Sequence, residues 1–447
     1  TGRIMTQCPR QPGLARVLDG LLGFDGHEFY FSSHPELNGK SFEEALYMFP
    51  NAVVIGAKTS ESNKVIINPD RDFRFGLGDE VVVLAEDEDT YSVDLPTEKE
   101  LKSWCKDMSY DTGETPVPEP ERVLFIGWRR DLDDMIVQLD PYVAKGSELV
   151  LFSQQDVKQR IKSMEDGGLN VDVDLQNLTI KHEIGNSISR RHLKRLGLQD
   201  FNSVLILADE QLELDVTKMD SRSLTTLLLI RDINHRSILE LNGSSGSSGS
   251  DESSGSTEEE MKKKSGGAEV KKKLKKSGSK RSVGNHRLDL AEVVDKERWI
   301  QDVLKGGVHS HTDDEKVKKK RTPIISEILD PKTKLLIQSG SVSDFVASNE
   351  LISKALAMVA ESLEVAQILR ELLSAEGHEV YMRDTQRYLR PGEFLSFYDV
   401  TARCRLLNEI FIGYCATGSS EIQLNPSNKR KKRRWESSDC LITIALD

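Results

Sequence analysis

Two stretches of this chain repeat one pattern, and this internal duplication constrains the fold more than any other feature. An apolar helical stripe runs into Gly-His-Glu-x-Tyr at residues 14–30 and again at residues 365–381. Three further pairs of segments match in the same order: 51–56 with 408–413, 64–69 with 421–426, and 79–85 with 439–445. Such ordered matches indicate two copies of one supersecondary unit, and two copies are too few for a solenoid.

The first copy shows what the unit contains. Leu14, Val17, Leu18, Leu21 and Leu22 lie at helical spacing. The elements predicted after this helix are a strand at 27–31, a short helix at 41–48, and strands at 53–55, 65–67 and 81–84. A helix that docks on such strands makes a small α+β lobe. The sequence therefore predicts one lobe at residues 1–95 and a second at residues 363–447.

Between the two copies, short apolar runs alternate with helical stretches. The runs are residues 123–126, 149–152, 178–180 and 204–207, and a helix is predicted at 215–231. This alternation is typical of a parallel sheet with crossover helices. It predicts a Rossmann-like domain at residues 121–241, which follows a proline-rich linker at 96–120 with one helical turn around Trp104. The predicted fold class is α/β, a Rossmann-like parallel-sheet domain flanked by the two lobes.

An insert interrupts this domain. Residues 242–320 are rich in Gly, Ser and Lys and carry blocks of like charge. A segment of this composition buries too little apolar surface to offset the conformational entropy lost on ordering. The insert is therefore predicted to be disordered apart from a short helix near 288–304. The domain then resumes at 321–362 with a strand at 323–328. A helix with Asn349 as its N-cap follows that strand.

Composition narrows the functional classes. The net charge of -12 argues against wholesale nucleic-acid binding, and the basic runs at 271–275 and 429–434 are predicted to be solvated loops, although such runs can bind phosphates. Five cysteines without CxxC spacing indicate neither a disulfide framework nor a zinc site, and they favour a reducing compartment. No apolar run approaches the roughly 18 residues of a membrane span. Because a helix follows Thr1 almost directly, we expect the chain to be a fragment.

The loop after residues 123–126 holds the first candidate site. A strand that ends in Gly127 and leads into a helix is where a dinucleotide-binding fold places its pyrophosphate. Residues 128–132 lack the second and third glycines of that fingerprint, and residues 153–155 offer no ribose-binding acid. We therefore expect no bound NAD. Arg129 and Arg130 could hold an anion, but a structural ion pair is favoured. The candidate ligand-binding residues are Gly127, Arg129, Arg130 and Asp131.

Acidic clusters provide candidate calcium ligands. Calcium needs several oxygen ligands that converge on one point. Acids occur at the helix start after Gly127, directly after residues 204–207, and at residues 86–89. The alternative is that carboxylates at helix N-termini are favoured by the dipole and that charged turns are ordinary solvated surface. The candidate metal residues are Asp134, Asp209 and Glu210.

The sequence contains no constellation that indicates catalysis. Neither a Ser/His/Asp nor a Cys/His arrangement stands out, and no paired-carboxylate motif does. We therefore expect a protein that is not an enzyme. The competing interpretation, based on the βαβ pattern, is an NAD(P)-binding Rossmann-type enzyme or a soluble nucleotide-sensing regulator. A soluble nucleic-acid-associated protein that uses the basic tracts is the weakest of the three.

Several segments resemble a known family. These are residues 10–31, the VIINPD and GDEVVVLAEDEDTY segments, VLFIGWRRD at 123–131, SNELISKALAMVAE at 348–361, and the closing IGY and LNP segments. Together they resemble the cytosolic part of the plant CASTOR/POLLUX ion channels. The resemblance implies a gating ring of RCK type, in which tandem units each contain a Rossmann-like lobe and a small α+β lobe. In this interpretation, the Rossmann partner of the first lobe and the pore helices are encoded upstream.

The resemblance also implies partners and a location. Four subunits would close a homotetrameric ring beneath a cation pore, with no nucleic-acid partner, and Ca2+ would be the regulatory ligand. The family is associated with calcium-regulated cation flux across the nuclear envelope and with symbiotic signalling, and related members are placed in the plastid envelope. We therefore predict the regulatory region of a ligand-modulated cation channel on the cytosolic or nucleoplasmic face of a membrane.

Overall fold

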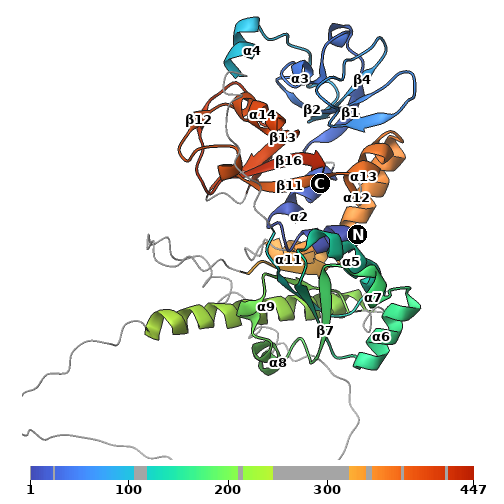
Figure 1. The fold of residues 1–447 in the computed structure, drawn as a ribbon, viewed down its shortest axis with the longest axis vertical. Helices are drawn as coiled ribbons and strands as arrows, with labels where there is room; N and C mark the ends of the chain where they lie inside the picture. Colours follow the sequence, from blue (N-terminus) through green and yellow to red (C-terminus); the bar gives the residue numbers. More distant parts are fainter. Residues whose placement is uncertain are drawn as a thin grey trace, which may run out of the picture. The chain divides into compact units, whose positions relative to one another are not determined.

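The computed structural model describes residues 2–23, 26–104, 118–209, 215–244, 322–338, 345–373, 377–417 and 421–446. The chain divides into one compact unit of residues 1–231 and 314–447 and a second unit of residues 232–313. The described part of the first unit is built on a six-stranded parallel sheet and two four-stranded antiparallel sheets (Figure 1). Within the second unit, the structure describes residues 232–244. The predicted insert lies outside the described residues from residue 245 onward, including its short helix.

The first lobe is a four-stranded sheet in the order β1-β4-β2-β3. Its elements are α1 (Gly2–Gln7), α2 (Leu14–Leu21), β1 (Glu28–Ser32), α3 (Phe42–Ala45), β2 (Ala52–Lys58), β3 (Val65–Ile67) and β4 (Glu80–Ala85). All its strand pairs are antiparallel. The strands predicted from the sequence are confirmed. Helix α4 (Glu98–Trp104) contains the turn expected around Trp104, and helix α1 packs on α5 (Leu132–Leu139) of the central domain.

The second lobe repeats this topology in the order β11-β16-β13-β14. Its elements are α13 (Val365–Leu373), β11 (His378–Asp384), β12 (Phe394–Leu395), α14 (Phe397–Leu406), β13 (Ile410–Cys415), β14 (Ile422–Leu424), β15 (Arg433–Arg434) and β16 (Cys440–Leu446). The added hairpin of β12 and β15 forms a separate two-stranded sheet. The duplication predicted from the sequence is therefore a duplication of the fold.

The two lobes also share individual hydrogen bonds. Ser41 and Glu44 form a capping box at the start of α3, and Ser396 and Asp399 form one at the start of α14. A capping box satisfies two orphan N–H donors at once and fixes where a helix starts. Equivalent residues therefore define the same helix start in both copies.

A second shared contact holds the hairpin ends. The Asp79 carboxylate accepts a hydrogen bond from the backbone N–H of Ser60 at 2.8 Å. In the second lobe, Asp439 accepts one from the backbone N–H of Thr417 at 2.7 Å. Charge-assisted bonds to backbone N–H groups are about twice as strong as neutral ones. Asp79 and Asp439 therefore bind the equivalent backbone N–H group in each copy.

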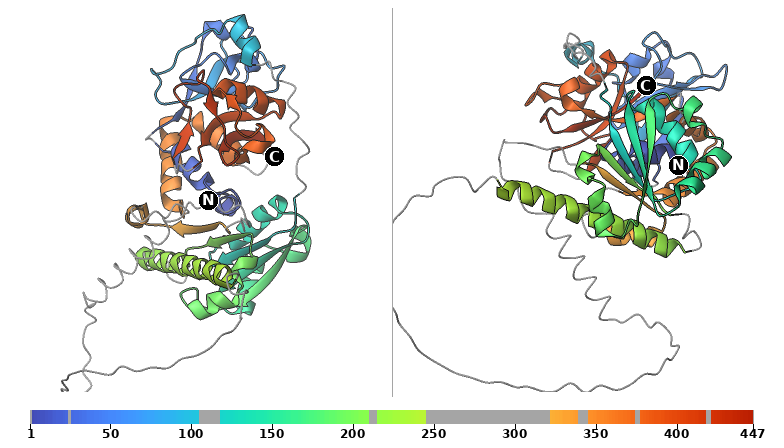
Figure 2. Two further views of the ribbon diagram at one scale, coloured as in Figure 1. Left: turned by 90° about the vertical axis from the view of Figure 1, so that its left-hand side faces the viewer. Right: turned by 60° about the horizontal axis from the view of Figure 1, so that its bottom comes forward.

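The central domain is a parallel sheet in the order β10-β9-β8-β5-β6-β7. The right-hand view of Figure 2 shows its green strands side by side. Its strands are β5 (Arg122–Ile126), β6 (Ser147–Ser153), β7 (Leu178–Ile184), β8 (Ser203–Ile206), β9 (Ile324–Ile328) and β10 (Phe345–Ala347). Its helices are α5, α6 (Val157–Asp166), α7 (Val171–Asp174), α8 (Arg190–Arg195), α9 (Val216–Ser244), α11 (Pro331–Gln338) and α12 (Ser348–Glu361). This order is that of a doubly wound Rossmann-like sheet, and it reverses between β5 and β8. Strand β9 pairs with β8, so the sheet does resume after the insert, as predicted.

Two predicted helix ends in this domain are wrong. Helix α9 extends to Ser244, beyond the predicted end at residue 231. Helix α12 starts at Ser348 after Ala347, so Asn349 is not the N-cap. The Asn349 side chain instead donates a hydrogen bond to the carbonyl oxygen of Leu329 at 3.2 Å. Tertiary contacts decide the start of α12.

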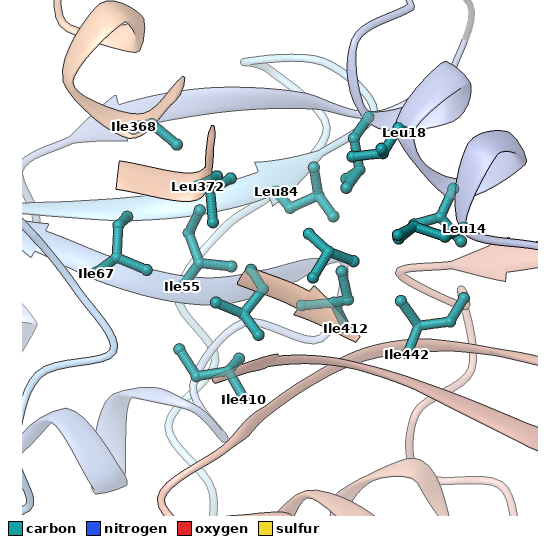
Figure 3. Close-up of a cluster of buried hydrophobic side chains, with 14 of the residues drawn as sticks. Leu14, Leu18, Ile55, Ile67, Leu84, Ile368, Leu372, Ile410, Ile412 and Ile442 are labelled. Carbon is teal, nitrogen blue, oxygen red and sulfur yellow. The ribbon is translucent and has the colours of Figure 1, made fainter. Parts of the chain in front are cut away.

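The apolar core joins the two lobes to each other. Helix α13 of the second lobe contacts β3 of the first, and α2 of the first lobe contacts β11 of the second. Figure 3 shows Leu372 beside Ile55 and Leu14 close to Ile442, all within one cluster of buried side chains. Each lobe therefore buries part of its apolar surface against the other copy, which makes the pair one cooperative structure.

Polar contacts between the lobes are reciprocal. The Asn68 side-chain amide donates to the carbonyl oxygen of Asn408 at 2.6 Å, and that of Asn425 donates to the carbonyl oxygen of Asn51 at 2.8 Å. These are the equivalent positions of the two copies. Asn68 and Asn425 both have left-handed backbone angles, which Asn tolerates better than most residues. The same loop in each copy thus binds the other copy.

A cation accompanies each of these asparagines. Arg405 donates to Oδ1 of Asn68, and Arg71 in turn donates to the carbonyl oxygen of Arg405. On the other side, the Lys429 ammonium lies 2.8 Å from the carbonyl oxygens of both Pro50 and Ala52 and 2.6 Å from Oδ1 of Asn425. The prediction of a solvated loop at 429–434 is therefore wrong for Lys429, which is 2% exposed. Burial lowers the pKa of Lys429 to about 7.

This pKa gives a pH test of the lobe interface. The unfolded Lys429 has a pKa of about 10.4, so between pH 7 and pH 10 the unfolded chain binds more protons there than the folded chain. Stability from this group therefore rises with pH. The difference in unfolding free energy between wild type and Lys429→Met, measured in urea, should grow by about 2 kcal/mol from pH 7 to pH 9.

The control is Lys431→Met, which changes an exposed residue of the same loop. This variant should stay within about 0.5 kcal/mol of wild type at both pH values. If the difference in unfolding free energy between wild type and Lys429→Met stays constant or decreases from pH 7 to pH 9, the surrounding oxygens keep the ammonium charged.

Candidate functional site at the carboxyl edge of the parallel sheet

A crevice lies where the order of the parallel sheet reverses. It is formed by the ends of β5 and β8 together with the first turns of α9. Its polar lining comes from Ser187, Asp209, Arg222, Ser223 and Thr226. Ligands of doubly wound sheets bind outside the carboxyl ends of the strands at this switch point. The position therefore makes the crevice the candidate site.

Gly127 closes one side of the crevice. Its φ of +107° lies in a region that L side chains rarely adopt, and an added Cβ would lie 2.7 Å from the carbonyl oxygen of Leu207. Its backbone N–H donates to the carbonyl oxygen of Phe152 at 3.0 Å. A glycine is required here because the backbones of neighbouring strands approach so closely. This requirement explains the residue without a bound pyrophosphate.

Arg129 forms the structural ion pair that the sequence favours. Its guanidinium binds both carboxylate oxygens of Asp131 at 2.8 Å, and it also contacts Glu327 of β9. Glu327 is 1% exposed and accepts hydrogen bonds from the Ala208 N–H at 2.9 Å and the Ser348 hydroxyl at 2.8 Å. This network joins the loops after β5 and β8 to β9 and to the start of α12.

The charged groups of this network shift the pKa values of one another. Burial would lower the pKa of Arg129, but the Glu327 and Asp131 carboxylates raise it above its usual value. Burial raises the pKa of Glu327, and Arg129 opposes this rise. The network therefore pairs the buried carboxylate of Glu327 at the edge of the crevice, where an unpaired charge would be costly.

Asp209 is the acidic residue of the crevice. It is 5% exposed, and its Oδ2 lies 3.8 Å from Nε of Arg222. The same Nε donates to the Ser187 hydroxyl at 3.2 Å. A carboxylate, a guanidinium and hydroxyl groups thus converge where three segments meet. The space between these groups is about 10 Å³, which holds about one water-sized group.

The structure brings together only some of the predicted site residues. Gly127 and Asp209 line the crevice, and Arg129 and Asp131 lie beside it in the ion-pair network. The Arg130 side chain is exposed. Asp134 is exposed on α5 and is not part of the crevice lining. Glu210 lies outside the described residues. Within the described ranges, no group of three His, Cys, Asp or Glu side chains is arranged to hold a metal ion.

Sequence reasoning missed three of the polar residues involved. Glu327 was predicted only as part of a strand, although an acid inside the apolar run Ile-Ile-Ser-Glu-Ile is itself a signal of a buried partner. Arg222 was read as part of a helix with a core face, and Ser187 lies in a loop without a motif. Their roles arise only from the sheet order, which brings distant segments together.

Comparisons with known proteins define the class. In the described segments, no helix is long and apolar enough to cross a membrane. The fold matches the gating ring of human SLO3 with a TM-score of 0.53 and 10% identity, over 100% of this chain and 74% of that chain. The chain therefore has a gating-ring fold of RCK type.

Sequence matches define the family. The family described as "Castor and Pollux, part of voltage-gated ion channel" matches residues 1–100. The ion channel CASTOR of Lotus japonicus is 40% identical over 445 residues, which are 99% of this chain and 45% of that protein. The probable ion channel POLLUX of Oryza sativa subsp. japonica is 38% identical over 99% of this chain and 40% of its own length. This chain belongs to the CASTOR/POLLUX family, and it spans less than half the length of these relatives.

The ion-pair network yields a stability prediction. Glu327→Leu should lower the unfolding free energy by about 3 kcal/mol, because the Ala208 N–H and the Ser348 hydroxyl lose their acceptor and Arg129 loses its buried partner. The double variant Arg129→Met with Glu327→Leu should lose clearly less than the sum of the two single changes. Urea unfolding of the three variants measures this coupling.

Glu165→Ala, at an exposed position of α6, is the matched control and should stay within about 0.5 kcal/mol of wild type. Strictly additive losses at 129 and 327 would contradict the network.

Proposed function

We propose that this chain is the regulatory gating-ring region of a ligand-modulated cation channel, whose pore lies in another part of the protein. The observation that carries the proposal is the gating-ring fold over the whole chain, together with alignment to named ion channels over 99% of its length. A closed ring of four such chains would present one copy of the crevice per subunit. Heterologous contacts between identical subunits close into rings of this kind.

We propose Ca2+ as the regulatory ligand. Asp209 would supply carboxylate oxygen, and the hydroxyl groups of Ser187, Ser223 and Thr226 lie around the same crevice. This donor set consists of oxygen atoms, which Ca2+ prefers. A site with one described carboxylate would bind weakly, with a dissociation constant on the order of 10⁻⁵ to 10⁻³ M.

Arg222 provides the coupling element in this proposal. It lies on α9, whereas its partners Asp209 and Ser187 lie in loops after β8 and β7. A cation bound at Asp209 would repel the guanidinium and favour a state in which α9 has shifted against the sheet. Coupling of this kind requires that the ligand bind one state of the ring more tightly than the other.

The proposed location of the assembled channel is supported by the similarity to named ion channels. We propose that this region faces the cytosol or nucleoplasm at a membrane, with the nuclear envelope favoured and the plastid envelope as the alternative. A role in symbiotic calcium signalling belongs to the same proposal.

An NAD(P)-binding enzyme or nucleotide-sensing regulator is less well supported. The sheet order would suit a nucleotide. However, the loop after β5 has Trp128 buried at 1% exposure and Arg129 turned toward Glu327, so bulky side chains stand where a pyrophosphate would approach the backbone. We propose that the chain binds no NAD and is not an enzyme.

Calorimetric titration of the purified chain tests the calcium proposal. Wild type should bind Ca2+ with a dissociation constant on the order of 10⁻⁵ to 10⁻³ M. Asp209→Asn should weaken binding at least tenfold, because it removes the only described carboxylate of the crevice. NAD(H) and NADP(H), titrated into the same preparation, should give no heat of binding.

Asp134→Asn is the matched control, since this acid is exposed on α5. It should bind Ca2+ like wild type. Loss of binding in the Asp134 variant but not in the Asp209 variant would move the site to α5, and no binding to wild type would remove Ca2+ as the ligand.

A further inference from the structure

Two cysteines of the second lobe lie directly opposite each other on neighbouring strands. Cys415 ends β13 and Cys440 begins β16, and the antiparallel register pairs them. Directly opposed residues in antiparallel strands have Cα atoms about 4.5 to 5.5 Å apart, which lies within the range that disulfides span. Neither residue forms a disulfide in this structure.

The surroundings of the pair allow chemistry from outside. Both side chains are partly exposed, in contrast to Cys8 and Cys404, which are buried completely. The Cys440 thiol lies 3.4 Å from the carbonyl oxygen of Arg383 on β11, a weak contact that a bond to Cys415 would replace. A small oxidant can therefore reach this pair of thiols more readily than the two core thiols.

We propose that Cys415 and Cys440 form a reversible redox modification site, which is oxidised to an intramolecular disulfide by a peroxide. This site is independent of the ligand proposed for the crevice. Sequence spacing does not reveal it, because 24 residues separate the two cysteines and only the strand pairing brings them together.

The reaction balances with hydrogen peroxide as the oxidant. Burial, together with the neighbouring Cys415, raises the pKa of Cys440 to about 12, so Cys440 stays a thiol and the first attack falls to Cys415. The Cys415 thiolate attacks one peroxide oxygen, the O–O bond breaks, and the leaving hydroxide takes up a proton as water. The Cys440 sulfur then displaces the oxygen of the sulfenic acid as a second water. Two thiols lose two protons and two electrons, and one peroxide becomes two waters.

The position of the pair gives the bond a structural consequence. Residues 416–439 lie between the two cysteines and include β14 and β15. This segment carries Asn425 and Lys429, which bind the first lobe. A disulfide would close the base of this segment and restrict the unfolded chain. Oxidation therefore stabilises the segment that makes this contact between the lobes, and reduction by cellular thiols breaks the disulfide again.

The test treats the purified, folded chain with hydrogen peroxide and maps its peptides by mass spectrometry after free thiols are alkylated. We expect a peptide pair that joins Cys415 to Cys440, has lost two hydrogen atoms, and disappears after dithiothreitol. Oxidation should also raise the unfolding temperature by roughly 5 °C.

Three variants separate the outcomes. Cys415→Ser and Cys440→Ser should each lose both the linked peptide and the gain in unfolding temperature. Cys105→Ser is the matched control and should keep both. The proposal would be overturned if wild type did not react, if one cysteine were overoxidised without a link, or if the link joined any other cysteine. The peptide map of wild type decides this even if a variant does not fold.

Discussion

The structure depends on the exchange of contacts between the two copies of the small lobe. An asparagine of each copy donates a hydrogen bond to the other copy: Asn68 donates to the Asn408 carbonyl oxygen, and Asn425 donates to the Asn51 carbonyl oxygen. Each copy also sends a helix, α2 or α13, across the apolar core. Because neither lobe buries its apolar face alone, the stability of each lobe depends on the other.

The central sheet contributes a different kind of rigidity. Arg129 and Glu327 join four segments that meet at its carboxyl edge. The neighbouring crevice is held by the longer contact between Asp209 and Arg222, at 3.8 Å. The chain belongs to the CASTOR/POLLUX family and has the fold of a gating ring.

The sequence predicted the parts of this fold that depend on local pattern. Strands such as β2 and β8, and the equivalence of the Asn68 and Asn425 loops, follow from apolar runs and the repeat. It did not predict the burial of Lys429 or the partner of Arg129, since both depend on which segments meet across the fold. Asn349 failed as an N-cap for the same reason. The candidate residues Gly127 and Asp209 were found because a position after a parallel strand is itself a tertiary signal. Cys415 and Cys440 carried no such signal.

A regulatory Ca2+ site at Asp209 is tested most directly by recording from the full-length channel in a planar bilayer, with Ca2+ varied on the side that this region faces. Open probability should change with Ca2+. Asp209→Asn should move the midpoint of that response at least tenfold toward higher Ca2+, while conductance through each open channel stays the same. A response to Ca2+ that Asp209→Asn leaves unchanged, or a channel indifferent to Ca2+, would contradict a regulatory site at the carboxyl edge of this sheet.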